Sequence, residues 1–228
     1  MPLEALRWPL TPLGLHYLLI HYDVPSVDVD AWRLELTGRV ARPTAFSLDE
    51  LKLRETVTVP VTMECAGNGR GGLTPRPRSQ PWLDDAVGTA AWTGTPLAPL
   101  LREAGVSGQA VEVLFSGFDC GVEGGIAQAY ERSLPVSEAL EGDAILARGI
   151  SEVALPPQHG FPVRLVVPSW YGMTNVKWLR RITVLHTPLE GYQQAHAYRI
   201  RHSEDELGEP VTRILPRALM MPPASLTS

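Results

Sequence analysis

A single cysteine in a glycine-rich turn is the residue of this chain best suited to carry chemistry. Residues 64–70 read Glu-Cys-Ala-Gly-Asn-Gly-Arg. Gly67 and Gly69 permit positive φ angles and a close approach of the backbone to a bound group. A thiol in such a turn can ligate a metal or act as a nucleophile, and Arg70 would lower its pKa and attract an oxyanion. The common alternative is that such a cysteine is chemically inert and only packs in the core, and this alternative applies to Cys65 as well.

The residues before this turn predict the strand that would position the thiol. Apolar side chains recur at every second position over residues 56–63. A period of two is typical of a half-buried strand, because successive side chains point to opposite faces. The apolar positions are Val57, Val59, Val61 and Met63. We therefore expect a strand that ends just before Cys65 and delivers it to a loop.

Patterns elsewhere predict further strands and short helices. Apolar runs predict strands over residues 32–38, 111–115, 145–148, 163–167 and 181–184. Ser47, with a glutamate three residues later, has the spacing of a helix capping box. Thr95 and Ser133 are predicted to cap two more helices. Because 20 glycines and 21 prolines are scattered along the chain, we expect a loop-rich α+β fold without long helices.

The size and charge of the chain exclude several classes of protein. With 228 residues, it is long enough for one large domain or two small ones. A formal net charge of −5 without a basic run argues against a nucleic-acid partner. No apolar run is long enough to span a membrane, and the N-terminus does not read as a signal peptide. We therefore expect a cytoplasmic protein.

Two cysteines, Cys65 and Cys120, limit the possible metal chemistry. They cannot by themselves form a zinc site, a c-type haem attachment or an iron–sulfur cluster. A disulfide between them is disfavoured in the cytoplasm. Any metal centre would therefore belong to a single cofactor, and its electrons would be exchanged with an external carrier.

The sequence around Cys65 resembles the molybdenum-binding loop of the sulfite oxidase family, in which a cysteine thiolate binds the metal of a molybdopterin cofactor. Residues 159–164, His-Gly-Phe-Pro-Val-Arg, followed by Val-Lys-Trp at 176–178, resemble the family's pterin-phosphate-binding segment. A planar guanidinium and a lysine suit a phosphate dianion. The resemblance covers roughly residues 11–223.

This resemblance implies an α+β molybdopterin-binding fold, with mixed β-sheets, short helices and many loops. Cys65 would be the metal ligand. The substrate side would comprise Cys65 with Arg70, Trp82 and Tyr198. The implied cofactor contacts are His21, Thr62, Asp119, Ser133, His159, Arg164, Asn175 and Lys177.

The chain departs from the family pattern at three places. Leu19 stands where the family has an arginine that helps to hold an oxyanion, and leucine cannot replace it. Asn175 replaces a serine, with similar hydrogen-bonding capacity. Residues 1–202 are expected to form the molybdopterin-binding domain, and residues 203–228 resemble the start of an absent dimerisation domain. A monomer is therefore plausible.

The implied activity is oxygen-atom transfer on a small molecule, either sulfite or another S- or N-oxygenated compound. Electrons would be exchanged with an external carrier or a haem subunit. Two alternatives remain open. The domain could bind molybdopterin as a non-catalytic subunit or carrier, or Cys65 could be the nucleophile of a metal-free thiol enzyme, although no histidine is positioned by the sequence to activate it.

Overall fold

Strands dominate the computed structural model, which describes residues 5, 7–203 and 205–218. Among the described residues, the first of two main sheets has five strands in the order β2-β1-β10-β5-β6. Strands β1 and β10 are parallel, whereas the other neighbours are antiparallel. The bounds are β1 Leu34–Gly38, β2 Thr44–Phe46, β5 Glu112–Glu123, β6 Ile126–Pro135 and β10 Leu179–Leu185.

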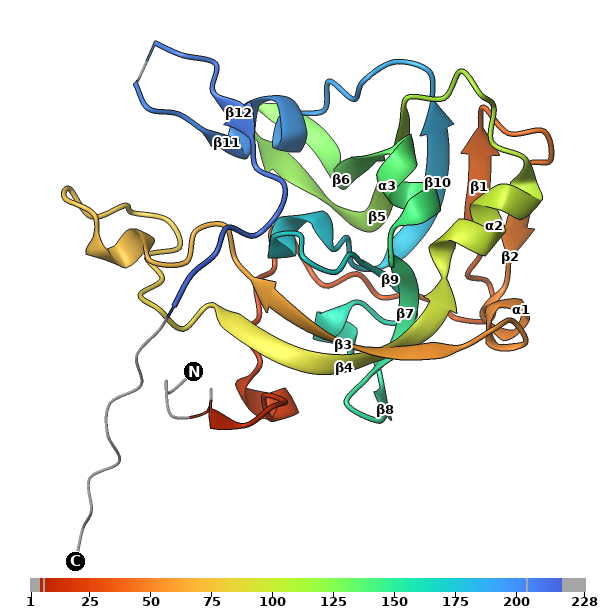
Figure 1. The fold of residues 1–228 in the computed structure, drawn as a ribbon, viewed down its shortest axis with the longest axis horizontal. Coiled ribbons are helices and arrows are strands. Elements are labelled where there is room, and N and C mark those ends of the chain that lie inside the picture. Colours follow the sequence, from red (N-terminus) through yellow and green to blue (C-terminus); the bar gives the residue numbers. More distant parts are fainter. Residues whose placement is uncertain (1–4, 6, 204, 219–228) are drawn as a thin grey trace, which may run out of the picture.

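The second sheet is antiparallel and forms a separate layer, with β3 and β4 lying below β5, β6 and β10 in the view of Figure 1. Its order is β3-β4-β7-β8, and β9 pairs with β7. Strand β3 ends at Glu64, so the predicted strand before Cys65 is confirmed. The bounds are β3 Val57–Glu64, β4 Val87–Pro96, β7 Ile145–Ile150, β8 Val153–Ala154 and β9 Arg164–Val166. A small pair is formed by β11 Arg199–Ile200 and β12 Glu209–Pro210.

The helices are short, as expected. They are α1 Leu48–Lys52, α2 Leu97–Ala104 and α3 Val136–Glu141. Single turns lie at Leu13–Leu15, Arg70–Gly72, Pro157–His159 and Gly172–Thr174, with a π turn at Gln193–Ala197. None of the helices in the described part of the chain is long and apolar enough to cross a membrane.

One predicted helix cap is confirmed and two are wrong. Ser47 and Glu50 form the full capping box at the start of α1. The N-cap positions of α2 and α3 are instead Pro96 and Pro135, each the last residue of a strand, and the fixed φ of proline suits a helix start. Thr95 lies in β4 and donates a hydrogen bond to the Leu51 carbonyl. Ser133, in β6, likewise caps no helix.

The main core joins both sheets. Its buried residues include Phe115 and Ile182 from the first sheet and Leu100 from α2. Leu146 of β7 and Leu165 of β9 belong to the same cluster. Because apolar side chains from both layers are removed from water together, burial favours one fixed arrangement of the sheets.

Strand β5 is longer than predicted, because it runs on from residue 115 to Glu123. The pairing with β6 shifts register between Ser116 and Cys120. In this interval the Phe118 amide donates to the Trp178 carbonyl at 2.9 Å. A β-bulge is a common device for re-aiming a side chain. It brings Asp119 beside the loop that carries Lys177, whose charge acts on the Asp119 carboxyl.

Residues 211–217 pack on the body of the protein. Trp170 and Arg213 form an antiparallel bridge, and Val211 is buried. The Ile214 amide donates to the Ser169 carbonyl at 2.9 Å. Of residues 203–228, which resemble the start of a dimerisation domain, residues 204 and 219–228 lie outside the described residues. The division at residue 202 stays a prediction.

Candidate active site

Cys65 lies directly after β3 in a tight turn and is only 5% exposed. Its amide donates to the Ala86 carbonyl at 2.9 Å, and its carbonyl accepts from the Asn68 amide at 2.9 Å. Burial raises the pKa of the Cys65 thiol, against the opposing effects of the Gly67 amide and the Arg70 cation. A nearby metal cation would reverse this balance, since a coordinating thiol is deprotonated.

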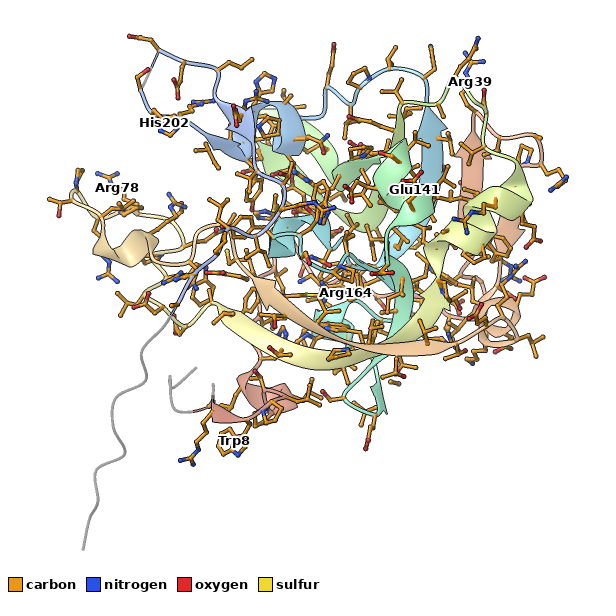
Figure 2. All side chains as sticks on the ribbon, in the orientation of Figure 1. Trp8, Arg39, Arg78, Glu141, Arg164 and His202 are labelled. Atoms are coloured by element: carbon orange, nitrogen blue, oxygen red, sulfur yellow. The ribbon has the colours of Figure 1, made fainter. Side chains whose placement is uncertain are left out.

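Arg164 lies at the centre of the molecule (Figure 2) and is 6% exposed. Its guanidinium donates to the carbonyls of His159 and Asn175 at 3.0 and 2.9 Å. It also lies over the Trp92 ring, 4.7 Å from the centroid. Among the described residues, no carboxylate forms an ion pair with Arg164, and its Nε has no partner. Burial lowers its pKa to about 10, so the side chain remains a cation.

Lys177 supplies a second cationic group beside Arg164. Its Nζ donates to the Leu19 carbonyl at 2.5 Å. Burial, followed by the charge of Arg164, lowers the Lys177 pKa to about 7, while Asp119 opposes this shift. An anion bound here would therefore favour the charged form of Lys177.

Two buried histidines, His16 and His159, flank these cations. Their ring centroids lie 5.8 Å apart. Burial lowers the pKa of each to about 4, with Arg164 adding to the effect. His16 Nδ1 lies 3.0 Å from the Tyr17 carbonyl, which can only accept, so Nδ1 carries the proton. His16 Nε2 is therefore an acceptor, and it has no partner among the described residues.

These groups share one cavity of about 50 Å³ with the thiol. A second cavity of similar volume adjoins it, since Leu19 and Lys177 line both. In the second cavity His21 Nε2 lies 2.7 Å from the Tyr198 hydroxyl. Burial raises the Tyr198 pKa and lowers the His21 pKa, so both are neutral at pH 7. The first cavity is lined by His16, Tyr17, Leu18, Leu19, Met63, Cys65, His159, Arg164 and Lys177, and the second by Leu19, His21, Asp119, Tyr130, Met173, Asn175, Lys177 and Tyr198.

Asp119 faces the second cavity, and its carboxyl is about half protonated at pH 7. It is 5% exposed, and burial raises its pKa to about 7. Its Oδ1 has no hydrogen-bond partner within the described part of the chain. Asn175 lines the same cavity, but its Oδ1 accepts from the Val167 amide at 2.7 Å, so its side chain also fixes the local backbone.

Four predicted site residues do not line either cavity. Thr62 points to the exposed face of β3, where its hydroxyl lies 2.7 Å from that of Thr89. Ser133 donates to Glu112 at 2.6 Å. Arg70 directly follows the turn that holds Cys65, and its charge acts on both Cys65 and Tyr198. Trp82 lies beside this turn, because its carbonyl accepts from the Gly71 amide at 2.7 Å.

Sequence reasoning missed His16. It stands inside an apolar stretch, directly after a one-turn helix, where an isolated histidine gives a weak signal. Space for its ring comes from Gly88 on β4, because a Cβ at that position would lie 2.8 Å from His16 Cδ2.

The described residues contain no group of three or more His, Cys, Asp or Glu side chains that could hold a metal ion. A metal at Cys65 would therefore need ligands that the described protein residues do not supply. A wider hollow of about 520 Å³ is lined by Lys52, Arg148 and Phe161, among others, but it includes none of the predicted site residues.

Comparisons with a family model and with curated proteins point to the same family. The family model described as "Oxidoreductase molybdopterin binding domain" matches residues 21–193. The NAD(P)H nitrate reductase of Hordeum vulgare is 38% identical over 207 residues, covering 87% of this chain and 23% of that protein. The NADH nitrate reductase of Spinacia oleracea is 36% identical over 211 residues, covering 87% of this chain and 22% of that protein. The chain thus spans less than a quarter of the length of these curated relatives.

A solved structure shares the fold. The sulfane dehydrogenase SoxCD from Paracoccus pantotrophus superposes with a TM-score of 0.73 and 29% identity, covering 83% of this chain and 47% of that chain. The expected α+β architecture of mixed sheets and short helices is confirmed. His16 and Tyr198 lie outside the residues that the family model matches.

Proposed function

The chain belongs to the sulfite oxidase and nitrate reductase family of molybdopterin-binding oxidoreductase domains, and from this premise we propose that it catalyses oxygen-atom transfer on a small oxygenated substrate. The substrate would be sulfite or another S- or N-oxygenated compound. Cys65 is the proposed ligand of a molybdenum ion carried by the pterin.

One observation carries the proposal. A cysteine thiol shares a cavity with Arg164 and Lys177, and neither cation forms an ion pair with a carboxylate of the described residues. A buried cation without an anionic partner is costly, so its retention points to an anionic ligand. The phosphate of a molybdopterin supplies such a charge.

The remaining donor set also fits this group. His16 Nε2 and Asp119 Oδ1 are buried atoms without partners among the described residues, and both can interact with the N–H groups of a pterin. The thiolate of Cys65 is a soft, electron-donating metal ligand. When bound, the cofactor would supply the two-electron redox chemistry, and the protein would orient it.

At the substrate end, we assign positioning and proton transfer to three side chains. Arg70 supplies a permanent positive charge near the thiol. Tyr198, neutral and 2.7 Å from His21, can donate to a substrate oxygen while His21 holds its hydroxyl in place. Trp82 would contact the substrate on the side of the turn that holds Cys65.

The position of Leu19 affects the choice of substrate. Its carbonyl binds Lys177, and its side chain offers no charge to an oxyanion. A charge-assisted hydrogen bond is worth about 1.5–3 kcal/mol, so one missing arginine would weaken sulfite binding by roughly ten- to a hundredfold. We therefore expect a high Michaelis constant for sulfite, and a low micromolar value with fast turnover would contradict this expectation.

Electrons would be exchanged with a separate carrier or haem subunit. The curated relatives are named as nitrate reductases that use NADH or NAD(P)H, and this chain matches less than a quarter of their length. Visible spectral changes on adding a reductant and then an oxygen-atom donor would distinguish catalysis from a carrier role.

The decisive experiment measures the molybdenum-to-protein ratio in protein purified from a host that makes molybdopterin. We expect a ratio near one, together with pterin fluorescence after denaturation. Cys65→Ser should abolish turnover and Cys120→Ser should leave it unchanged, because Cys120 is exposed and lines neither cavity. A ratio near zero without pterin fluorescence would refute the proposal.

A further inference from the structure

A buried arginine, Arg132, lies on β6 and lines neither cavity of the candidate site. It is 2% exposed, and among the described residues no carboxylate forms an ion pair with it. Its guanidinium donates instead to two backbone carbonyls, that of Gln193 at 2.7 Å and that of Val211 at 3.4 Å. A buried cation without a carboxylate partner is costly, so the groups that it binds indicate what it does.

Both acceptors belong to residues that hold the backbone of Tyr198. The Tyr198 amide donates to the same Gln193 carbonyl at 3.2 Å, and the Val211 amide donates to the Tyr198 carbonyl at 3.0 Å. The Arg132 guanidinium also lies over the Tyr198 ring, 5.5 Å from the centroid. The face of an aromatic ring attracts a cation in this position. One side chain therefore holds both the backbone and the ring of Tyr198.

The next residue of β6 attaches the same segment. The Ser133 amide donates to Gln194 Oε1 at 3.0 Å, and Gln194 Nε2 donates to the Ser133 hydroxyl at 2.6 Å. In Figure 1 the blue turn between β10 and β11 lies beside β6. Two consecutive residues of β6 thus hold the π turn that directly precedes Tyr198.

The Tyr198 ring depends on such contacts, because its own segment offers few. The two residues before it, His196 and Ala197, are exposed. Its hydroxyl nevertheless lies in the second cavity, 2.7 Å from His21 Nε2. A fixed ring is needed to keep the hydroxyl at that place, since a small displacement of a reacting group is costly in rate.

We propose that Arg132 is a positioning residue for Tyr198, because it holds the ring and the flanking backbone so that the hydroxyl points into the second cavity. The catalytic purpose, donation to a substrate oxygen, rests on the proposed function. The position of the ring belongs to the protein chain itself and can be tested without a cofactor.

The first test places 3-fluorotyrosine at position 198 of the cofactor-free chain and records its fluorine NMR signal in H2O and in D2O. The difference between the two solvents grows as the ring becomes exposed to water. In Arg132→Met we expect this difference to rise towards that of the urea-unfolded chain. Arg54→Met is the matched control, because Arg54 lies 4.8 Å over the Phe46 ring and lines neither cavity. A parent-like difference in folded Arg132→Met overturns the proposal.

Hydrogen exchange separates a local effect from a general loss of stability. In Arg132→Met the amides of Tyr198 and Val211 should exchange about tenfold faster or more, which corresponds to about 1.4 kcal/mol of lost protection. The Leu179 amide, which donates to the Val163 carbonyl at 2.8 Å in the core, is the internal control. An equal acceleration of all three amides would mean that Arg132 serves overall stability alone, and it would overturn the proposal.

The second test uses the molybdenum-loaded protein with sulfite as the substrate. We expect Arg132→Met to lower kcat about tenfold or more and to change KM less than about threefold, because the Tyr198 hydroxyl would act on the reacting oxygen. In a Tyr198→Phe background the same change should lower kcat no further, because the hydroxyl that Arg132 positions is gone. An equal fall in both backgrounds overturns the proposal.

The proposal stays testable if Arg132→Met does not fold. Arg132→Lys keeps the charge but lacks the planar group that binds two carbonyls and lies over the ring. It should give a smaller change of the same kind in the fluorine signal and in the exchange of the Tyr198 amide, and no change in either overturns the proposal. Protein without molybdenum that shows these changes supports the role of Arg132 while the proposed function fails. Protein with molybdenum and an unchanged Tyr198 refutes this inference alone.

Discussion

The titratable side chains at the candidate site share one physical condition, the loss of water around a charge. Burial lowers the pKa of His16 and His159 to about 4 and of Lys177 to about 7, and it raises that of Asp119 to about 7. Each shift favours the neutral form. The side chains of the pocket by themselves therefore carry less charge than their residue types suggest, and a bound anion would restore the charge of Lys177.

The histidines predict a loss of stability in acid. Between pH 6.5 and 4 the unfolded chain protonates His16 while the folded chain does not, so the free energy of unfolding falls as the pH falls. For His16 the loss approaches about 3 kcal/mol. His16→Phe should retain more of its stability in urea unfolding between pH 7 and pH 4.5. The exposed His186→Phe is the control, and equal pH slopes in the two variants would contradict the prediction.

Asp119 predicts the opposite pH dependence. Its folded pKa of about 7 exceeds the ordinary value of 3.8, so the folded chain retains a proton that the unfolded chain has released. Stability is therefore lost as the pH rises from about 4 to 7. Cofactor-free Asp119→Asn should be more stable than the parent at pH 8 by about 2–4 kcal/mol in denaturant titrations. Asp49→Asn is an exposed control, and a less stable Asp119→Asn would refute the prediction.

Single residues differ in how well the sequence predicts their positions. Cys65, Arg164 and Lys177 lie together as expected, because their motifs fix both the residue and its loop. Thr62 does not join them, since it alternates with the buried Val61 and Met63 and must point to the other face of β3. The alternation of side chains along the strand is by itself enough to predict that Thr62 points away from the buried face. Their roles as cofactor ligands stay predictions.

At the scale of helices and strands, a short sequence pattern predicts the structure correctly where the interacting residues are close together in the sequence. The α1 capping box involves residues three apart, and both of its hydrogen bonds are present. The bulge in β5 depends instead on the Trp178 carbonyl, sixty residues away from Phe118, which takes the place of a β6 partner. No local pattern could have predicted that contact, so the strand was predicted to end too early, at residue 115.

The capping box gives a prediction for α1. Ser47→Ala removes the acceptor of the Glu50 amide and the partner of its carboxylate, bonds of 3.2 and 2.8 Å. Loss of an N-cap costs about 1 kcal/mol, which corresponds to a fall in Tm of about 2–4 °C for a domain of this size. Calorimetry can measure this shift. Ser47→Asn, which can still cap the helix, should keep most of the stability, and an unchanged Tm in Ser47→Ala would show that the cap contributes nothing.

At the scale of the whole molecule, the site forms where the two sheets meet. Cys65 follows β3 of the second sheet, and Asp119 lies on β5 of the first. Lys177, on the loop before β10, lines both cavities and so links the two groups. The family resemblance correctly predicted the fold. Residue patterns alone could not have given this meeting point, because it depends on packing between segments more than fifty residues apart.

Because Arg164 and Lys177 lie together where the two sheets meet, we predict that an anion stabilises the cofactor-free protein. Sulfate is a suitable probe, because its charge is constant between pH 5 and 9. At ten times its Kd, a ligand that binds only the folded state adds about 1.4 kcal/mol, or about 2–4 °C in Tm. The effect should be larger at pH 6 than at pH 8.5, since Lys177, with a pKa of about 7, is charged only at the lower pH.

Arg164→Met separates this binding from the general stabilising effect of sulfate on proteins. Arg164→Met replaces the buried cation by an apolar side chain of similar length. It also leaves the carbonyls of His159 and Asn175 without their donor, so we expect some loss of stability in the absence of sulfate. The variant should lose the sulfate-dependent rise in Tm beyond the general effect, measured against chloride at equal ionic strength. An equal rise in the parent and in Arg164→Met at pH 6 would mean that the cavity holds no anion, and the assignment of Arg164 and Lys177 to a phosphate would then fail.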